Sequence, residues 1–249
     1  MRFQRFILYL TIIAAFVGSL WGSMTVGEFH MFPYRWLMLF MWVMLSINIL
    51  QNRGRLDLSY CKVTLYYQFF AIWLGLAILS VIWAAAKGEA VRNIILLFLG
   101  ISIVFFMVHY LRRLAHLMRL YWLWCLILAV LITVGIWEAT TGNHLQSSRL
   151  YEEDLPWKVF APTAVFHNEN DYAAYIALSL PMILAGIWHS RGLVVRAVGI
   201  PLFAAGIWVL LLTSSRSCYI ATLMGLFFGF LFLLKLNKRI TALISVVGL

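Results

Sequence analysis

The fold is decided by residues 197–234, which read AVGIPLFAAGIWVLLLTSSRSCYIATLMGLFFGFLFLL. Two apolar runs of helix length flank the polar stretch Thr213–Ser217, and both runs are too apolar for a surface in water. Between Arg196 and Lys235 the sole charged residue is Arg216. This pattern predicts two membrane-spanning helices joined by a turn that presents one arginine.

Arg216 has two interpretations. Its guanidinium offers a planar fork of donors that matches phosphate oxygens, and it lies among the hydroxyls of Ser215 and Ser217. If Ser217 begins the next helix, the free N–H groups of that first turn favour the same negative charge. Alternatively, Arg216 is an interfacial anchor whose side chain reaches lipid headgroups. We therefore predict an anion-binding group at these three residues, with the anchor as the alternative.

The rest of the chain is equally apolar, since 64% of its 249 residues are hydrophobic and 11% are charged. Apolar runs of about 17–25 residues recur from end to end, so we predict an all-α, polytopic membrane bundle. The predicted segments are 6–23, 32–50, 64–86, 93–110, 121–139, 170–188, 197–213 and 217–234. A ninth segment begins near Ile240 and is cut short at Leu249, so we expect one transmembrane domain over 1–249 that is part of a longer protein.

Basic residues indicate the orientation, because they concentrate on the cytoplasmic side of membrane proteins. Most of the 19 Lys and Arg residues lie in alternate loops, beginning with Arg2 and Arg5 before the first segment. The acidic residues, apart from Asp57, fall in the other loops or at their edges. The N-terminus is therefore predicted to be cytoplasmic. The net charge of +10 is a topology signal, and we predict no nucleic-acid partner.

The connection 141–169 is predicted to be a long extracytoplasmic loop. Long loops in compact folds are usually functional or disordered. Pro156, Pro162 and the apolar stretch Trp157–Phe166 favour a segment that lies on the membrane surface or folds over a cavity.

A second polar motif, FHNENDYAAY at 166–175, leads into the next helix. Asn170 or Asp171 is an adequate N-cap for that helix, which is a structural explanation of the motif. In the functional interpretation, its amides and carboxylates line a sugar pocket. The predicted pocket residues are His167, Asn168, Glu169, Asn170 and Asp171. Their spacing fits no specific metal-ligand pattern, so we predict no metal.

A third candidate is Arg35, which lies between Tyr34 and Trp36 at the start of the second segment. With an aromatic residue on either side, an interfacial anchor is the default interpretation. Arg35 is alternatively a second cation for a diphosphate, whose charge suits two arginines better than one.

The last complete segment places Ser217, Ala221, Gly225 and Gly229 four residues apart on one helix face. Small residues allow close helix contact. We expect this face to pack inside the bundle and to hold Arg216 in place, with a dimer interface as the alternative.

The sequence contains no nucleophile elbow, zinc-binding helix, P-loop or dinucleotide fingerprint, and we predict no cofactor. Cytoplasmic loops of about ten residues are too short for a nucleotide-binding domain, so a substrate used at the outer face must arrive already activated. A sugar linked to a lipid diphosphate carries its own leaving group. An arginine near the diphosphate stabilises the charge that develops as the glycosidic bond breaks.

These motifs resemble those of the O-antigen ligase and O-antigen polymerase family of bacterial membrane glycosyltransferases. The resemblance rests on Thr213–Ser217 with its small-residue helix, on the asparagine-rich entry at 162–181 into a proline-containing helix, and on Pro33–Arg35. It implies metal-independent transfer or polymerisation of glycans from an undecaprenyl-diphosphate carrier at the outer face of the cytoplasmic membrane, with Arg216 on the diphosphate. It also implies a general-base histidine in a later external loop, so we expect that base outside these residues.

Three alternatives stay open. Within the family, a polymerase extends a chain whereas a ligase moves a finished glycan, and the residues do not separate the two. A transporter or flippase for lipid-linked sugars also needs cations and amides, although we find no internal repeat and few charges at mid-membrane. The third alternative is a noncatalytic scaffold that binds other proteins of a polysaccharide assembly complex. In that case Arg216 could be replaced without effect.

Overall fold

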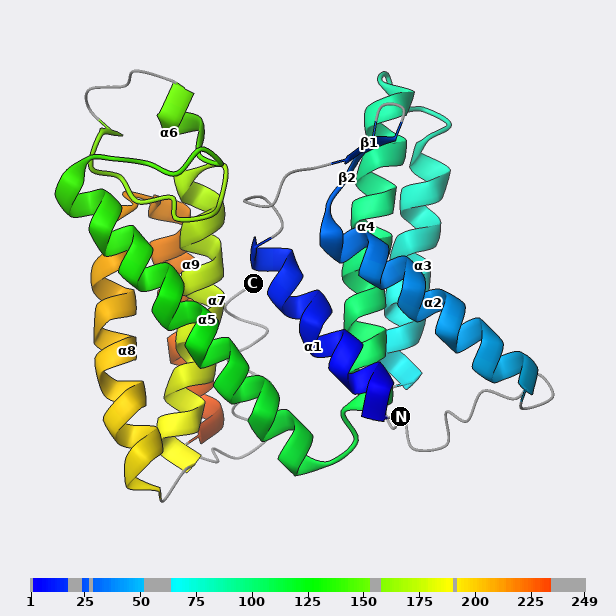
Figure 1. The fold of residues 1–249 in the computed structure, drawn as a ribbon. Helices are drawn as coiled ribbons and strands as arrows, with labels where there is room; N and C mark the ends of the chain where they lie inside the picture. The colour runs from blue at the N-terminus through cyan, green and yellow to red at the C-terminus, as the bar shows by residue number, and fades with distance from the viewer. Residues whose placement is uncertain are drawn as a thin grey trace. The chain divides into compact units, whose positions relative to one another are not determined.

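The computed structural model describes residues 2–17, 24–26, 29–51, 64–152, 158–189 and 192–233. Almost all of these residues are helical (Figure 1). The helices are α1 (Arg2–Val17), α2 (Pro33–Gln51), α3 (Thr64–Ser80), α4 (Lys87–Tyr110), α5 (Leu114–Thr141), α6 (Arg149–Glu152), α7 (Glu169–His189), α8 (Leu193–Leu212) and α9 (Arg216–Leu233). The exception is an antiparallel hairpin of β1 (Met24–Val26) and β2 (Phe29–Met31), in which Thr25 pairs with His30.

Within the described residues, five helices are long and apolar enough to cross a membrane, namely α2, α4, α5, α7 and α8, and parts of α3 and α9 form shorter apolar helices. Large apolar side chains such as Leu65 on α3 and Leu178 on α7 are exposed, as expected where lipid is the solvent. The helical character of the predicted membrane bundle is therefore confirmed. The number of crossings and the cytoplasmic N-terminus stay predictions, and the ninth segment near Ile240 lies outside the described residues.

Several helices begin earlier than the apolar runs that predict them. α4 begins at Lys87 rather than at 93, α5 at Leu114 rather than at 121, and α8 at Leu193 rather than at 197. The apolar runs exclude charged residues, whereas helix propensity does not, because Lys, Arg and Glu are good helix formers. Charged side chains near these helix starts are therefore held in regular helical positions.

The contacts divide the chain into two units, Met1–Leu120 and Tyr121–Leu249. In the first unit α1 packs on α2, α3 packs on α4, and α4 also contacts α1 and α2. Trp42 of α2 stacks on Phe98 of α4 with ring centroids 5.6 Å apart, and its Nε1 donates to Ser102 Oγ at 3.1 Å. These contacts hold α2 against α4, while the prediction of one transmembrane domain stays a prediction.

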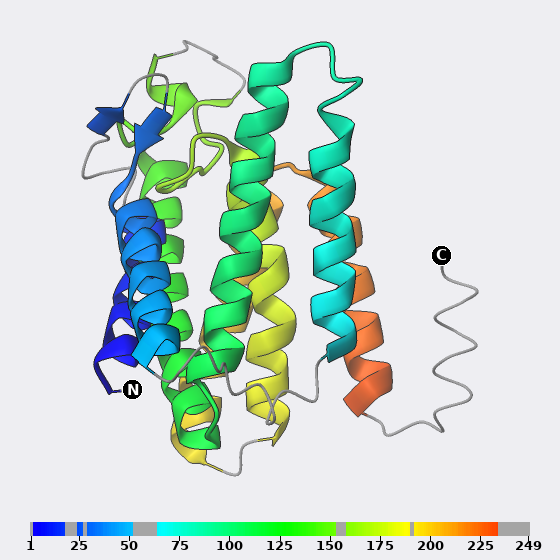
Figure 2. The same cartoon turned by 90° about the vertical axis from the view of Figure 1, so that its right-hand side faces the viewer.

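In the second unit α7 packs on both α8 and α9. The Tyr172 hydroxyl of α7 donates to the Leu131 carbonyl of α5 at 2.7 Å. Gly135 permits this approach, because a Cβ there would lie 2.6 Å from the Tyr172 hydroxyl oxygen. Both α7 and α9 begin at the end of this unit where α5 ends (Figure 1 and Figure 2). The first turns of α7 and α9 therefore lie near the loop that follows α5.

The contact between α9 and α7 includes part of the predicted small-residue face. A Cβ at Gly225 would lie 3.3 Å from Pro181 Cγ of α7, so the two helices are in close contact there. Cys218 and Thr222 are also buried, whereas Ala221 is exposed. Within the described residues, the buried face of α9 is thus rotated by about one residue from the predicted stripe.

Candidate functional site

The turn between α8 and α9 is fixed by local hydrogen bonds. The Thr213 hydroxyl donates to the Leu210 carbonyl at 2.6 Å, and the Tyr219 hydroxyl donates to the Leu211 carbonyl at 2.7 Å. Ser214 has a φ of 57°, in the left-handed region, which lets the chain reverse. The predicted turn between two apolar helices is confirmed, and Arg216 is the first residue of α9.

Arg216 is exposed and has no hydrogen bond or ion pair among the residues that the structure describes. The N–H groups of Arg216 and Ser217 lie in the first turn of α9, where no carbonyl of the helix can accept from them. A cation at a helix N-terminus opposes the helix dipole, so Arg216 does not stabilise α9. The guanidinium and these two N–H groups together form a donor set that suits a phosphate.

Ser215 adds a buried hydroxyl to this turn. The residue is 4% exposed, and its carbonyl accepts from the Tyr219 N–H at 3.2 Å. Its Oγ has no hydrogen-bond partner in the described part of the chain. A buried hydroxyl without a partner costs about 1–3 kcal/mol, so a ligand oxygen that reached this hydroxyl would relieve that cost.

The start of α7 is capped by Asn168, which corrects the prediction of a cap at Asn170 or Asp171. Asn168 Oδ1 accepts from the Asp171 N–H at 2.9 Å, and Asn168 Nδ2 donates to Asp171 Oδ2 at 2.8 Å. The cap lies earlier because Glu169 is already helical, which places Asp171 at the third helical position. His167, Asn170 and Asp171 are exposed. Among the described residues, no three His, Cys, Asp or Glu side chains lie close enough to hold a metal.

Glu169 connects α7 to the preceding loop. Its carboxylate is buried and accepts from Arg149 Nη2 at 2.8 and 3.1 Å, and it also pairs with Lys158 Nζ. The Arg149 backbone N–H donates to the His167 carbonyl at 2.8 Å, which joins the loop to the same turn. The carboxylate therefore already has two cationic partners, and its predicted contact with a sugar stays a prediction.

A second buried carboxylate, Glu138 in the last turn of α5, is a residue that sequence reasoning missed. It is 0% exposed and accepts from the N–H groups of Thr163 at 2.7 Å and Ala164 at 2.6 Å. His144 Nδ1 lies 3.6 Å from its Oε1. The feature of the sequence that could have identified Glu138 is a carboxylate at the end of an apolar segment, shortly before Gly142. Glu138 holds the distal part of the loop against the end of α5.

The two motifs that sequence analysis treated separately meet in the structure. The Cys218 thiol, in the first turn of α9, lies 3.8 Å from the Asn170 carbonyl oxygen in the first turn of α7. These residues are 48 positions apart in the chain. Arg216 and Ser217 therefore lie close to the polar start of α7, and the positive ends of two helix dipoles lie side by side.

Arg35, the third candidate, makes contacts with its neighbours in the first unit. Its Nε donates to Tyr34 Oη at 3.1 Å, and its guanidinium carbon lies 5.3 Å from the centroid of the Phe32 ring. Such contacts suit an interfacial anchor. Arg216 belongs to the second unit, so the prediction that both arginines bind one diphosphate stays a prediction.

No family model matches this chain, and no solved structure matches it. The chain is similar to the teichuronic acid biosynthesis protein TuaE of Bacillus subtilis (strain 168), with 26% identity over 249 residues. The match covers 98% of this chain and 50% of the relative, so the chain spans about half the length of the curated relative that it matches. The name of this relative assigns the relative to teichuronic acid biosynthesis, and the apolar helices of the present chain are those of a membrane protein.

Proposed function

We propose that this protein is a multi-pass enzyme of the bacterial cytoplasmic membrane that polymerises or ligates surface polysaccharide. Its substrate is a glycan linked to undecaprenyl diphosphate at the outer face of the membrane, as the resemblance to the O-antigen ligase and polymerase family implies. The similarity to a protein named for teichuronic acid biosynthesis supports a role in polysaccharide assembly. Of the two activities we favour polymerisation, because it serves envelopes with and without an outer membrane.

The proposal rests mainly on the position and the surroundings of Arg216. It is an exposed cation at a helix N-terminus, without a partner among the described residues, beside the buried and unpartnered hydroxyl of Ser215. An arginine that served only helix stability would be placed at the other end of the dipole. A diphosphate accounts for the guanidinium, the free N–H groups and the hydroxyl together.

In the proposed reaction, an acceptor hydroxyl attacks the anomeric carbon of the sugar, and the bond from that carbon to the diphosphate oxygen breaks. The acceptor loses its proton to a base, and negative charge develops on the departing diphosphate. Arg216, the N–H groups of Arg216 and Ser217, and the Ser215 hydroxyl stabilise this charge. Since the substrate brings its own leaving group, no nucleotide takes part.

The first turn of α7 and the residues just before it supply the proposed sugar contacts. His167, Asn170 and Asp171 are exposed beside the start of α9, and their side chains can hydrogen-bond sugar hydroxyls. Asn168 positions Asp171, and Glu169 holds the loop to α7.

The proposed topology puts the N-terminus in the cytoplasm and the starts of α7 and α9 at the outer face. Helices that cross a membrane in turn alternate in direction, so the end of α5 and the starts of α7 and α9 must share one side. The Cys218 contact with Asn170 and the Glu138 contacts with Thr163 and Ala164 support that arrangement.

The test is the amount and length of surface polysaccharide in cells whose only copy of the full-length gene carries Arg216→Ala. The matched control is Arg196→Ala, because Arg196 is also exposed and belongs to the same unit but lies at the start of α8, the opposite end of the helix pair. Both proteins are first verified at normal membrane levels.

The proposal expects lost polymer in Arg216→Ala, carrier-linked glycan accumulated at the outer face, and a normal pattern in Arg196→Ala. The same glycan trapped at the inner face would favour a flippase instead. An unchanged pattern in Arg216→Ala would make the residue an interfacial anchor and would contradict the proposed role.

A further inference from the structure

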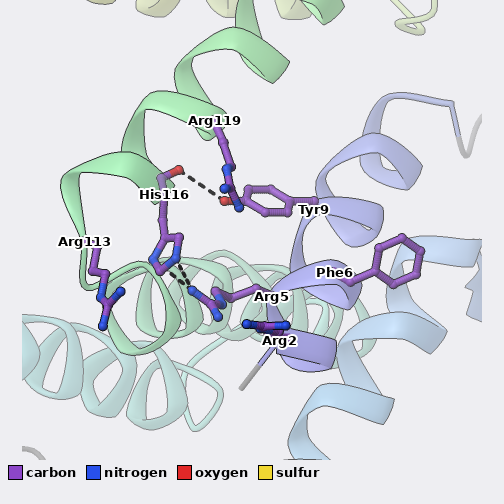
Figure 3. A pocket seen from close by; sticks show the side chains of 7 residues that line it. All are labelled: Arg2, Arg5, Phe6, Tyr9, Arg113, His116 and Arg119. Atoms are coloured by element: carbon purple, nitrogen blue, oxygen red, sulfur yellow. Dashed lines mark hydrogen bonds between the residues drawn. The ribbon is translucent and has the colours of Figure 1, made fainter.

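A strongly basic cavity lies in the first unit, apart from the residues used so far. Its volume is about 550 Å³, which is in the range of ligand sites. Figure 3 shows side chains from the start of α1 and from the start of α5 around it. The polar lining residues are Arg2, Arg5, Tyr9, Arg113, His116 and Arg119.

The spacing of these residues explains why they gather there. Arg2 and Arg5 are three positions apart on α1. Arg113 directly precedes α5, and His116 and Arg119 follow at intervals of three residues in its first turns. Residues three or four apart share one face of a helix. Each helix therefore presents one basic stripe to the cavity.

Two contacts hold the stripes together. The Arg5 guanidinium donates to the His116 ring, where its Nη1 lies 3.2 Å from Nδ1 and also contacts Nε2. The Tyr9 hydroxyl donates to the His116 backbone carbonyl at 3.1 Å (Figure 3). The starts of α1 and α5 are thus joined at His116, which fixes the cavity between them.

No acidic residue in the lining balances the positive charge of the cavity. Four arginines line it, and none of the lining residues is Asp or Glu. The first turns of α1 and α5 add the positive ends of two helix dipoles. Arg2, Arg113 and Arg119 are exposed, so their guanidinium forks are accessible to an anion. Like charges held this close repel one another unless an anion lies between them.

We propose that this cavity binds the phosphate groups of an anionic lipid headgroup. Basic pockets between membrane helices bind headgroups with two phosphates, and four arginines suit two phosphates better than one. Phe6, also in the lining, is 61% exposed and offers an apolar contact for an acyl chain. Such a contact distinguishes a lipid from a soluble phosphate. The predicted topology places this site at the cytoplasmic leaflet.

The test is the affinity of the purified full-length protein, freed of bound lipid, for three probes. Cardiolipin in detergent micelles carries two phosphates, phosphatidylglycerol carries one, and inorganic diphosphate has no acyl chain. The lining variant is Arg113→Gln with Arg119→Gln. The matched control is Arg112→Gln with Arg196→Gln, which removes the same charge from outside the cavity.

The proposal expects wild-type protein to bind cardiolipin more tightly than phosphatidylglycerol, with the lining variant weaker by about tenfold and the control unchanged. Inorganic diphosphate could bind to wild-type protein as tightly as cardiolipin and lose this affinity in the lining variant. That result would confirm a phosphate site but assign it to a soluble anion instead of a lipid. Equal cardiolipin affinity in the lining variant and wild type, or an equal loss in the control, would overturn the site. Thermal unfolding of each variant without lipid shows whether it is folded.

Discussion

Glu138 and Ser215 are two buried polar residues in opposite hydrogen-bonding states. The Glu138 carboxylate accepts from two backbone N–H groups of the loop after α5, whereas the Ser215 hydroxyl has no partner within the described residues. A buried charge with partners is a structural element, because losing them is costly. A buried hydroxyl without a partner is better explained by a ligand that supplies one. The two residues therefore predict different results when substituted.

Replacing Glu138 with Gln is expected to loosen the loop. The amide keeps one acceptor oxygen but loses the charge, and hydrogen bonds to charged groups contribute about 1.5–3 kcal/mol each. Hydrogen exchange of the Thr163 and Ala164 amides should therefore become faster, and the thermal midpoint should fall. Glu89→Gln is the control, because Glu89 is exposed on α4. Unchanged exchange at Thr163 would contradict the anchoring role.

Replacing Ser215 with Ala is expected to weaken ligand binding without lowering the stability of the fold. The free energy of unfolding should stay constant or rise, because an unpaired buried hydroxyl is removed. Affinity for the carrier diphosphate should fall by about tenfold if that hydroxyl donates to a phosphate oxygen. Ser147→Ala is the matched control, since the Ser147 hydroxyl is also buried and unpartnered within the described residues. Equal binding by both variants and wild type would remove Ser215 from the site.

At the scale of helices and loops, the sequence predicts the helices well and their contacts poorly. Apolar runs and the polar turn at Thr213–Ser217 identified α8 and α9 because hydropathy is a local property. The contact between Cys218 and Asn170 depends on how α9 packs against α7, which no local pattern encodes. The same holds for Glu138, whose partners lie 25 and 26 positions away in an irregular loop.

The close packing of α9 on α7 can be tested by enlarging a glycine at their contact. Gly225→Leu should force α9 away from Pro181, because even a Cβ would lie 3.3 Å from its ring, and such overpacking costs about 1–3 kcal/mol. The variant should lower the thermal midpoint and polymer formation together, since Arg216 is carried by α9.

Gly229→Leu is the control for this change. A Cβ at Gly229 would meet nothing within 4 Å in the described part of the chain. Both substitutions gain about 0.8–1 kcal/mol of helix propensity, so the difference between them isolates the packing cost. A smaller effect of Gly225→Leu than of Gly229→Leu would contradict the assigned face of α9.

For the whole molecule, the proposed topology is tested by labelling with a membrane-impermeant thiol reagent. Ala115 and Gln146 are exposed residues near opposite ends of α5. In a background where Cys61, Cys125 and Cys218 are replaced by Ser, Gln146→Cys should react in intact cells. Ala115→Cys should react only after the membrane is broken. The reverse pattern would invert the topology and place Arg216 on the cytoplasmic side.

The assignment of Arg216 to a carrier diphosphate is tested most directly by affinity measurements on purified full-length protein with undecaprenyl diphosphate. Arg216→Gln is compared with wild type and with Arg196→Gln, and undecaprenol serves as the reference ligand without phosphates. Charge-assisted hydrogen bonds to phosphate predict that Arg216→Gln weakens diphosphate binding by about ten- to a hundredfold and leaves undecaprenol binding and Arg196→Gln unchanged. Wild-type affinity for undecaprenyl diphosphate in Arg216→Gln would contradict the account.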